Sequence, residues 1–220
     1  MKQITCYLDF ISPYAYLAFE ALPEALMGQS YAMVYKPVLF AGMLKHYGQL
    51  GPAEIVPKRL WTYRQVLWLG KEQKIPLDMP SHHPFNPLAL LRLACACSGD
   101  THAPDGMPNR LVCEIIFRHV WQGGFNAEDQ ARIQALAESL PVKHDRLGEN
   151  VKHRLQANTR EAIDVGIFGV PSFHVDDKLF WGQDALPMLL AYLSGDPWFS
   201  DGSWAQADRV SVGQTRSKTG

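Results

Sequence analysis

The sequence predicts an α/β fold in which a small sheet is interrupted by a large helical insertion. Two short apolar segments lie at residues 4–10 and 31–39, and two more follow residue 166, as expected for buried strands. Most of the chain between them, residues 41–165, has helical periodicity or turn composition. A stretch of this length exceeds a normal connection within a compact domain, so we expect it to form a helical subdomain.

The first strand, residues 4–10, ends near a Ser-Pro pair, and a helix is expected over residues 13–26. Proline fits the first turn of a helix, where its missing N–H costs nothing, and serine is a good N-cap. The free N–H groups at this end of a helix stabilise an anion. Ser12 is therefore a candidate functional residue. The alternative is that it only caps the helix.

The insertion is predicted to be mainly helical. Residues 40–58 contain glycines and prolines, which indicates short or irregular pieces of the kind that lie over a ligand cleft. Turn-rich segments at 76–87 and 99–106 separate longer periodic stretches. The longer helices are expected at residues 58–73, 88–98, 108–122, 127–139 and 149–165.

The C-terminal pair of apolar segments lies at residues 166–175 and 178–184. The Asp176-Asp177 turn between them predicts a β-hairpin. A final helix is expected over residues 185–193, behind the hairpin.

These predicted elements divide the chain into a sheet domain, a helical insertion and a C-terminal tail. Residues 1–40 and 166–195 are expected to form the domain that holds the sheet, and residues 41–165 the helical insertion. Residues 196–220 lose hydrophobic periodicity and become polar and small towards the end, so we expect a disordered C-terminal tail.

The composition argues against several classes of function. The net charge of -1 favours neither nucleic acid nor an anionic membrane as a partner. There is no basic-then-apolar start and no apolar run near the ~20 residues that span a bilayer, so we expect a cytoplasmic protein. Neither the cysteines nor the His82-His83 pair has a convincing metal-site spacing, so no metal is expected and the role of the histidines stays open. Buried reduced thiols are the expected state of Cys6, Cys95, Cys97 and Cys113.

The stretch DFISPYAYLA, residues 9–18, resembles the start of a thioredoxin-like fold, in which a strand runs into a helix that carries the reactive group. Redox members have a C-x-x-C pair here, and this chain has Ser-Pro-Tyr-Ala at residues 12–15, so no dithiol can form. The stretch is more similar to kappa-class glutathione transferases and 2-hydroxychromene-2-carboxylate isomerases, within the DsbA-like branch of the fold. This resemblance implies that Ser12 stabilises the thiolate of bound glutathione.

Two later motifs carry the same resemblance. In GVPSF, it implies that the Val170-Pro171 bond is cis and that the exposed backbone of Val170 binds the cysteinyl part of glutathione. An unselected X-Pro bond is cis in only about 5–6% of cases. The WGQD segment resembles the site for the γ-glutamyl end, although family members usually have arginine next and this chain has Ala185. Spacing alone favours a plain helix cap at Asp184. The residues of this segment are Trp181, Gly182, Gln183 and Asp184.

Two residues of the insertion complete the implied glutathione site. Lys58 stands where the families have a lysine that pairs with the glycyl carboxylate, although a lysine that opens a helix is more often simply solvated. Gln49 stands where many relatives have asparagine.

The resemblance implies a glutathione-dependent isomerase that interconverts 2-hydroxychromene-2-carboxylate and trans-o-hydroxybenzylidenepyruvate, or a related intermediate of naphthalene-type aromatic degradation. The thiolate would add to a conjugated carbon, allow rotation and leave, so glutathione acts as a cofactor. The substrate is then a small aromatic 2-oxo acid, and a homodimer is expected. Tyr14, Lys45 and Asn86 are the candidate substrate contacts. Further aromatic side chains are candidate walls of the site: Tyr16, Phe40, Trp61 and Phe168.

Two other functions remain open at the level of the sequence. A kappa-like transferase that conjugates glutathione to electrophiles would use the same serine, cis-proline and aspartate. A catalytically silent protein of this fold would keep glutathione affinity without turnover. A disulfide oxidoreductase is excluded by the absence of C-x-x-C.

Overall fold

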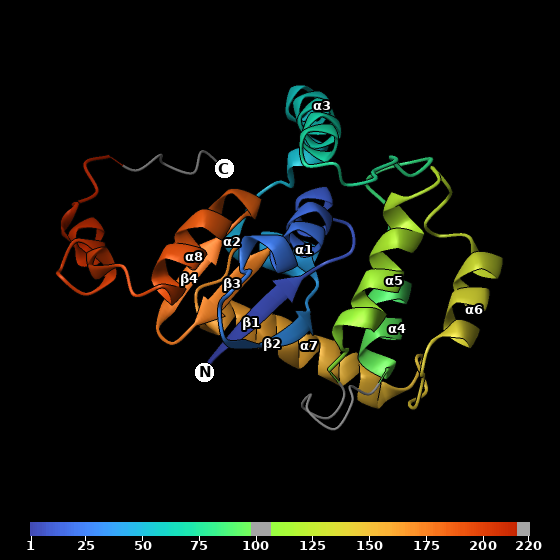
Figure 1. Cartoon of the computed structure of the whole chain (residues 1–220). Helices are drawn as coiled ribbons and strands as arrows, with labels where there is room; N and C mark the ends of the chain where they lie inside the picture. Colours follow the sequence, from blue (N-terminus) through green and yellow to red (C-terminus); the bar gives the residue numbers. More distant parts are fainter. Residues whose placement is uncertain (98–106, 215–220) are drawn as a thin grey trace.

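A computed structural model of the protein describes residues 1–97 and 107–214. Four strands form one sheet in the order β2-β1-β3-β4. The neighbours β1 and β2 are parallel, whereas β3 is antiparallel to both β1 and β4 (Figure 1). The strands are β1 (Lys2–Leu8), β2 (Tyr31–Pro37), β3 (Ser172–Val175) and β4 (Lys178–Trp181).

The helices follow the predicted order, and the segment expected to hold short helical pieces contains α2 and a 3₁₀ turn, η1 (Pro52–Glu54). Another 3₁₀ turn, η2 (Gln183–Ala185), joins β4 to the last helix. The α-helices are α1 (Pro13–Ala25), α2 (Phe40–Tyr47), α3 (Val56–Glu72), α4 (Leu88–Ala96), α5 (Arg110–Trp121), α6 (Gln130–Ser139), α7 (Glu149–Asp164) and α8 (Leu186–Leu193). The predicted thioredoxin-like fold with a helical insertion is therefore confirmed. The predicted surface loop at 99–106 lies outside the described residues.

Alternation along β1 places apolar side chains on both faces of the sheet. Ile4, Cys6 and Leu8 join the larger core together with side chains of α1 and α8, whereas Tyr7 joins a smaller core with Met43 of α2 and residues of α7. Successive residues of a strand point to opposite faces, so a strand buried on both sides reads as a nearly continuous apolar run.

The insertion packs to one side of the sheet, where α4, α5 and α6 lie beside one end of α7 (Figure 1). Its core is continuous with that of the sheet domain, because the ring of Phe117 on α5 lies 4.8 Å from Phe10 and 5.1 Å from Phe19, between centroids. The proposed domain boundaries stay a prediction. None of the helices in the two described stretches is long and apolar enough to cross a membrane.

Residues 197–209, part of the segment expected to be a disordered tail, have defined structure. Two 3₁₀ helices, η3 (Pro197–Phe199) and η4 (Trp204–Arg209), follow α8. The rings of Phe199 and Trp204 lie 6.0 and 5.9 Å from that of Phe180 in β4. A few aromatic side chains thus anchor a segment whose average composition is polar, which periodicity alone does not reveal.

Candidate functional site

Ser12 is the N-cap of α1, as predicted, and its side chain is buried. Its Oγ accepts a hydrogen bond from the Ala15 N–H at 3.2 Å and donates to the carbonyl oxygen of Val170 at 3.3 Å. The cap uses a lone pair of the oxygen, and the hydroxyl proton points across to the loop before β3. Capping and donation to an acceptor in the cleft are therefore compatible roles for one hydroxyl group.

The carboxylate of Asp9 holds the turn that leads to Ser12. Its two oxygens accept from the N–H groups of Ile11, at 3.1 Å, and of Phe40, at 2.9 Å. The side chain is fully buried, and this burial raises the pKa of Asp9 to about 7 although the backbone donors act against the rise. Asp9 thus joins the start of α2 to the turn before α1. The sequence analysis assigned no role to Asp9, although a carboxylate directly after an apolar strand indicated that the residue could have one.

Side chains of the insertion hold the same turn from the other side. The Nε2–H of His83 donates to the carbonyl oxygen of Ile11 at 2.8 Å, and the indole N–H of Trp121 donates to that of Phe10 at 3.0 Å. Burial lowers the pKa of His83, which favours the neutral ring, and the proton lies on Nε2 because the carbonyl oxygen of Ile11 can only accept. The structure therefore gives His83 a positioning role, which the sequence had left open. His82 instead contacts Glu128 at 2.9 Å near the surface.

The Val170-Pro171 peptide bond is cis, as the resemblance implied. The carbonyl oxygen of Pro171 accepts from the N–H of Gly182 at 2.9 Å, which ties the loop to the end of β4. Val170 contacts Ser12 across 158 positions of sequence. The structure thus brings together the three motifs that sequence analysis had linked only by resemblance.

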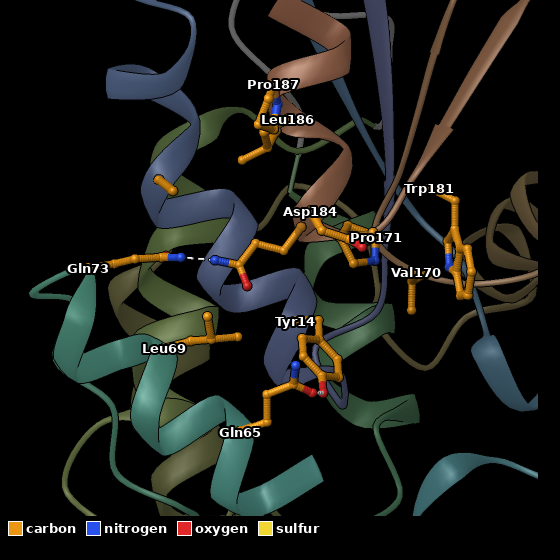
Figure 2. A pocket seen from close by; sticks show the side chains of 13 residues that line it. Tyr14, Gln65, Leu69, Gln73, Val170, Pro171, Trp181, Asp184, Leu186 and Pro187 are labelled. Atoms are coloured by element: carbon orange, nitrogen blue, oxygen red, sulfur yellow. Dashed lines mark hydrogen bonds between the residues drawn. The ribbon is translucent and has the colours of Figure 1, made fainter. Parts of the chain in front are cut away.

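A cavity of about 620 Å³ lies beside this junction. The α3 side is formed by Gln65, Leu69 and Gln73, with Val170 and Trp181 opposite (Figure 2). Gln65 and Leu69 of α3 and its C-cap residue Gln73 are four positions apart and so lie on one face of the helix. This spacing is visible in the sequence and could have predicted one wall of the cavity, which the sequence analysis did not identify.

Two hydrogen bonds connect α3 to the rest of the cavity. The Tyr14 hydroxyl donates to Gln65 Oε1 at 2.7 Å, and Gln183 Nε2 donates to Gln73 Oε1 at 2.6 Å (Figure 2). Burial raises the pKa of Tyr14, and the nearby charge of Asp184 adds to the rise. The phenol is therefore neutral at ordinary pH and acts as a donor.

Asp184 lies in η2 and lines the cavity. It does not cap the last helix, because the N-cap of α8 is Ala185 and the cap has no side-chain hydrogen bond. Within the part of the chain that the structure describes, no donor pairs with the Asp184 carboxylate. Gly182 has φ of 98°, and a Cβ there would lie 2.4 Å from Asp184 Oδ1. Glycine is thus required both for the backbone conformation and for the position of the carboxylate.

Four predicted residues lie outside the lining of this cavity. Lys45, at the end of α2, and Gln49, just after it, are exposed. Asn86 is also exposed, and its Oδ1 accepts from the N–H of Leu88 at the start of α4. Lys58 is exposed in the first turns of α3. The structure does not bring these four side chains together, and their roles stay predictions.

The candidate aromatic walls differ in their surroundings. Tyr16 is fully buried in the core, and Phe40 is half-buried against the smaller core. Trp61 is exposed on α3 but does not line the cavity. Phe168 is partly exposed and packs against Trp181.

The chain does not supply a thiolate of its own. All four cysteines are free and buried. Burial raises the pKa of Cys6 and Cys95 to about 12 and that of Cys97 to about 11, and it raises the pKa of Cys113 well above the ordinary value. A reaction that needs a sulfur nucleophile at this site would require a bound thiol.

Comparison with known proteins identifies the family. The sequence matches the model of the DSBA-like thioredoxin domain over residues 3–194. The chain belongs to this family. Within it, the chain is a member of the group that includes 2-hydroxychromene-2-carboxylate isomerases and kappa-class glutathione transferases.

Two relatives and one solved structure illustrate the match. The 2-hydroxychromene-2-carboxylate isomerase of Sphingobium xenophagum is 30% identical over 205 residues, covering 87% of this chain and 98% of the relative. Glutathione S-transferase kappa 1 of Rattus norvegicus is 26% identical over 219 residues, covering 90% of this chain and 92% of the relative. A solved 2-hydroxychromene-2-carboxylate isomerase superposes with a TM-score of 0.74 at 21% identity, covering 95% of this chain and all of that chain, and this likeness concerns the fold. The homologues of this chain are enzymes.

Proposed function

We propose that this protein is a glutathione-dependent isomerase of the 2-hydroxychromene-2-carboxylate type, acting on a small aromatic 2-oxo acid. The observation that carries the proposal is the contact of 3.3 Å between Ser12 Oγ and the carbonyl oxygen of Val170, before a cis proline. A donor hydroxyl and the backbone of the loop before β3 face each other beside a cavity. A bound thiol can lie in the cavity next to the Ser12 hydroxyl and the backbone of Val170.

The residues present fit glutathione. Asp184 offers a carboxylate with no donor in the described stretches, which suits the ammonium group of the γ-glutamyl end. Lys58 lies seven residues before Gln65 and so on the same face of α3, about 10.5 Å along the helix axis. A lysine there is placed to attract a carboxylate at the other end of an extended peptide.

When bound, glutathione supplies the thiolate that adds reversibly to a conjugated carbon of the substrate. Ser12 contributes by redirecting its one hydroxyl proton from the Val170 carbonyl oxygen to the sulfur, and this hydrogen bond favours the charged form of the thiol. Each unit by which a thiol pKa falls corresponds to about 1.4 kcal/mol. The N-terminus of α1 adds a partial positive charge at the same place. Asp9, His83 and Trp121 hold the turn, so that the hydroxyl is oriented before the ligand arrives.

The exposed face of α3 supports a homodimer. Leu60, Trp61, Leu67 and Trp68 are about half exposed or more and recur seven residues apart on one side of the helix. Large exposed apolar patches mark interaction sites in soluble proteins. We also place the protein in the cytoplasm, where glutathione is abundant and free thiols such as these four stay reduced.

The test is turnover of 2-hydroxychromene-2-carboxylate with and without glutathione, together with calorimetry of glutathione binding. Isomerisation that needs catalytic glutathione and leaves its concentration unchanged is expected. Accumulation of a glutathione adduct would instead establish a kappa-like transferase, and binding without turnover a silent protein. Asp184→Ala and Lys58→Ala should each weaken glutathione binding, whereas Lys71→Ala on another face of α3 should not. Unchanged affinity in both variants would place the site elsewhere.

A further inference from the structure

An exposed aromatic pair stands at the edge of the cavity. Trp181 is 54% exposed and Phe168 36% exposed. Their ring centroids lie 4.8 Å apart with an interplanar angle of 60°, an edge-to-face arrangement. Trp181 lines the cavity, and Figure 2 shows its indole on the side of Val170 away from Tyr14. Two large apolar surfaces are thus kept accessible beside the reactive junction.

The position of the indole is built into the backbone. A Cβ added to Gly169 would lie 2.5 Å from Trp181 Nε1 and 3.2 Å from Cε2, closer than side-chain atoms normally approach. Glycine at 169 is required by this close approach. Trp181 also pairs with Ser172 in the β3-β4 hairpin, so its backbone is held in the sheet. The indole ring therefore has a defined position against the backbone of Gly169.

The pair adjoins the place where the thiol would lie. Phe168 and Gly169 directly precede Val170, whose carbonyl oxygen contacts Ser12 Oγ. A carbon attacked by sulfur must come within about 3–3.5 Å of it, so the rest of the substrate must rest on a neighbouring surface. The indole N–H of Trp181 has no acceptor among residues 1–97 and 107–214 and can serve a polar group at the edge of a bound ring.

We propose that Phe168 and Trp181 form the subsite for the planar, conjugated aromatic part of an acidic substrate. The inference rests on the proposed function for the position of the sulfur. It assigns Trp181 to the aromatic acid, although the sequence resemblance had placed it among the glutathione-binding residues. Asp184 and α3, which line the other part of the cavity, remain the glutathione side.

The probe is 2-naphthoate, a planar aromatic acid that binds without reacting, and its affinity is measured by calorimetry beside that of glutathione. Trp181→Ala should weaken 2-naphthoate binding about tenfold and leave glutathione affinity within about twofold, since one aromatic contact corresponds to roughly a factor of ten. Trp181→Phe should restore most of the loss. Gly169→Ala should reproduce the loss with the indole still present, because the added Cβ displaces it.

Trp198→Ala is the matched control, because Trp198 is 41% exposed and packs edge-on against Phe199 away from the cavity. It should change neither affinity. Weaker glutathione binding with unchanged 2-naphthoate binding in Trp181→Ala would overturn the subsite, as would equal losses of both. If no isomerase turnover is found but 2-naphthoate binding depends on Trp181, the subsite stands and the proposed function falls. If turnover is found and Trp181→Ala keeps the wild-type KM for the aromatic acid, the subsite proposal is overturned while the proposed function stands.

Discussion

The two walls of the cavity are attached to the protein in different ways. One wall, called here the Ser12 wall, is α1, a helix of 13 residues of which seven are buried, and it lines the cavity through Tyr14 and Ala21. The turn at Ser12, from which α1 starts, is held by the side chain of Asp9 in the same segment and by those of His83 and Trp121 in the insertion. The opposite wall is α3, a helix of 17 residues in which Val66 and Gly70 are the buried ones. Figure 1 shows α3 at the edge of the molecule, beyond α1.

This difference gives the two walls different tasks: one holds a reacting group in a fixed orientation, and the other can adapt to a ligand. Burial and hydrogen bonds to fixed backbone groups hold a catalytic group in one geometry, which is what stabilisation of a developing charge needs. A helix joined to the cavity through polar side chains can shift with little loss of buried apolar contact. We expect the Ser12 wall to set the rate of reaction and the α3 wall to adapt to the ligand.

The largest expected effect compares Trp121, which holds the turn before α1, with Trp68 on α3. Trp121→Ala should lower the free energy of unfolding by about 3–5 kcal/mol, because it empties a fully buried site and leaves the Phe10 carbonyl without its donor. Trp68→Ala, on the exposed face of α3, should change it by no more than about 0.5 kcal/mol. Urea denaturation measures both. Equal losses would mean that the two walls are equally anchored.

Ser12→Ala should reduce turnover at neutral pH by roughly ten- to a hundredfold, which corresponds to one to two units of lost thiol pKa depression. The protein should still fold, since a lost N-cap costs about 0.5–2 kcal/mol. Thiolate absorbance of bound glutathione should appear at higher pH, and activity should partly recover in alkaline buffer. Full activity with an unshifted thiol pKa would reduce Ser12 to a helix cap.

Asp9 allows a test by pH. Its pKa is about 7 in the folded protein, against 3.8 for an ordinary aspartate. Between these values the folded state binds more protons than the unfolded state, so this group makes the free energy of unfolding fall as pH rises from about 4 to 7. Asp9→Asn should lose that contribution and show a flatter profile, by at least about 1.4 kcal/mol over the range. An unchanged profile would show that the Asp9 carboxyl does not titrate there.

Gln73→Ala should have the smallest effect. It removes one hydrogen bond between exposed side chains, so the free energy of unfolding should fall by less than about 1 kcal/mol and glutathione affinity should stay within a few-fold. Denaturation and calorimetry on the same preparation check both. A loss of glutathione binding comparable to that of Asp184→Ala would mean that α3 is a fixed part of the site.

Much of the fold and part of the site followed from local features of the sequence. Strand and helix periodicity is encoded over a few neighbouring residues, so the order of the elements, the helix cap at Ser12 and the hairpin at Asp176-Asp177 were all predictable. The cis bond at Val170-Pro171 required a resemblance as well, because local sequence leaves an X-Pro bond mostly trans.

Tertiary structure alone decided which side chains hold the turn at Ser12 and which helix faces it. Trp121 and His83 reach that turn from 111 and 72 positions away, and no local pattern encodes such a separation. Large apolar side chains of α3 lie on its exposed side, so a hydrophobic stripe does not mark the cavity face, and packing against α1 determined which face lines the cavity. A buried carboxylate such as Asp9 acquires its raised pKa only when folding removes it from water, which is why its role is a property of the folded chain.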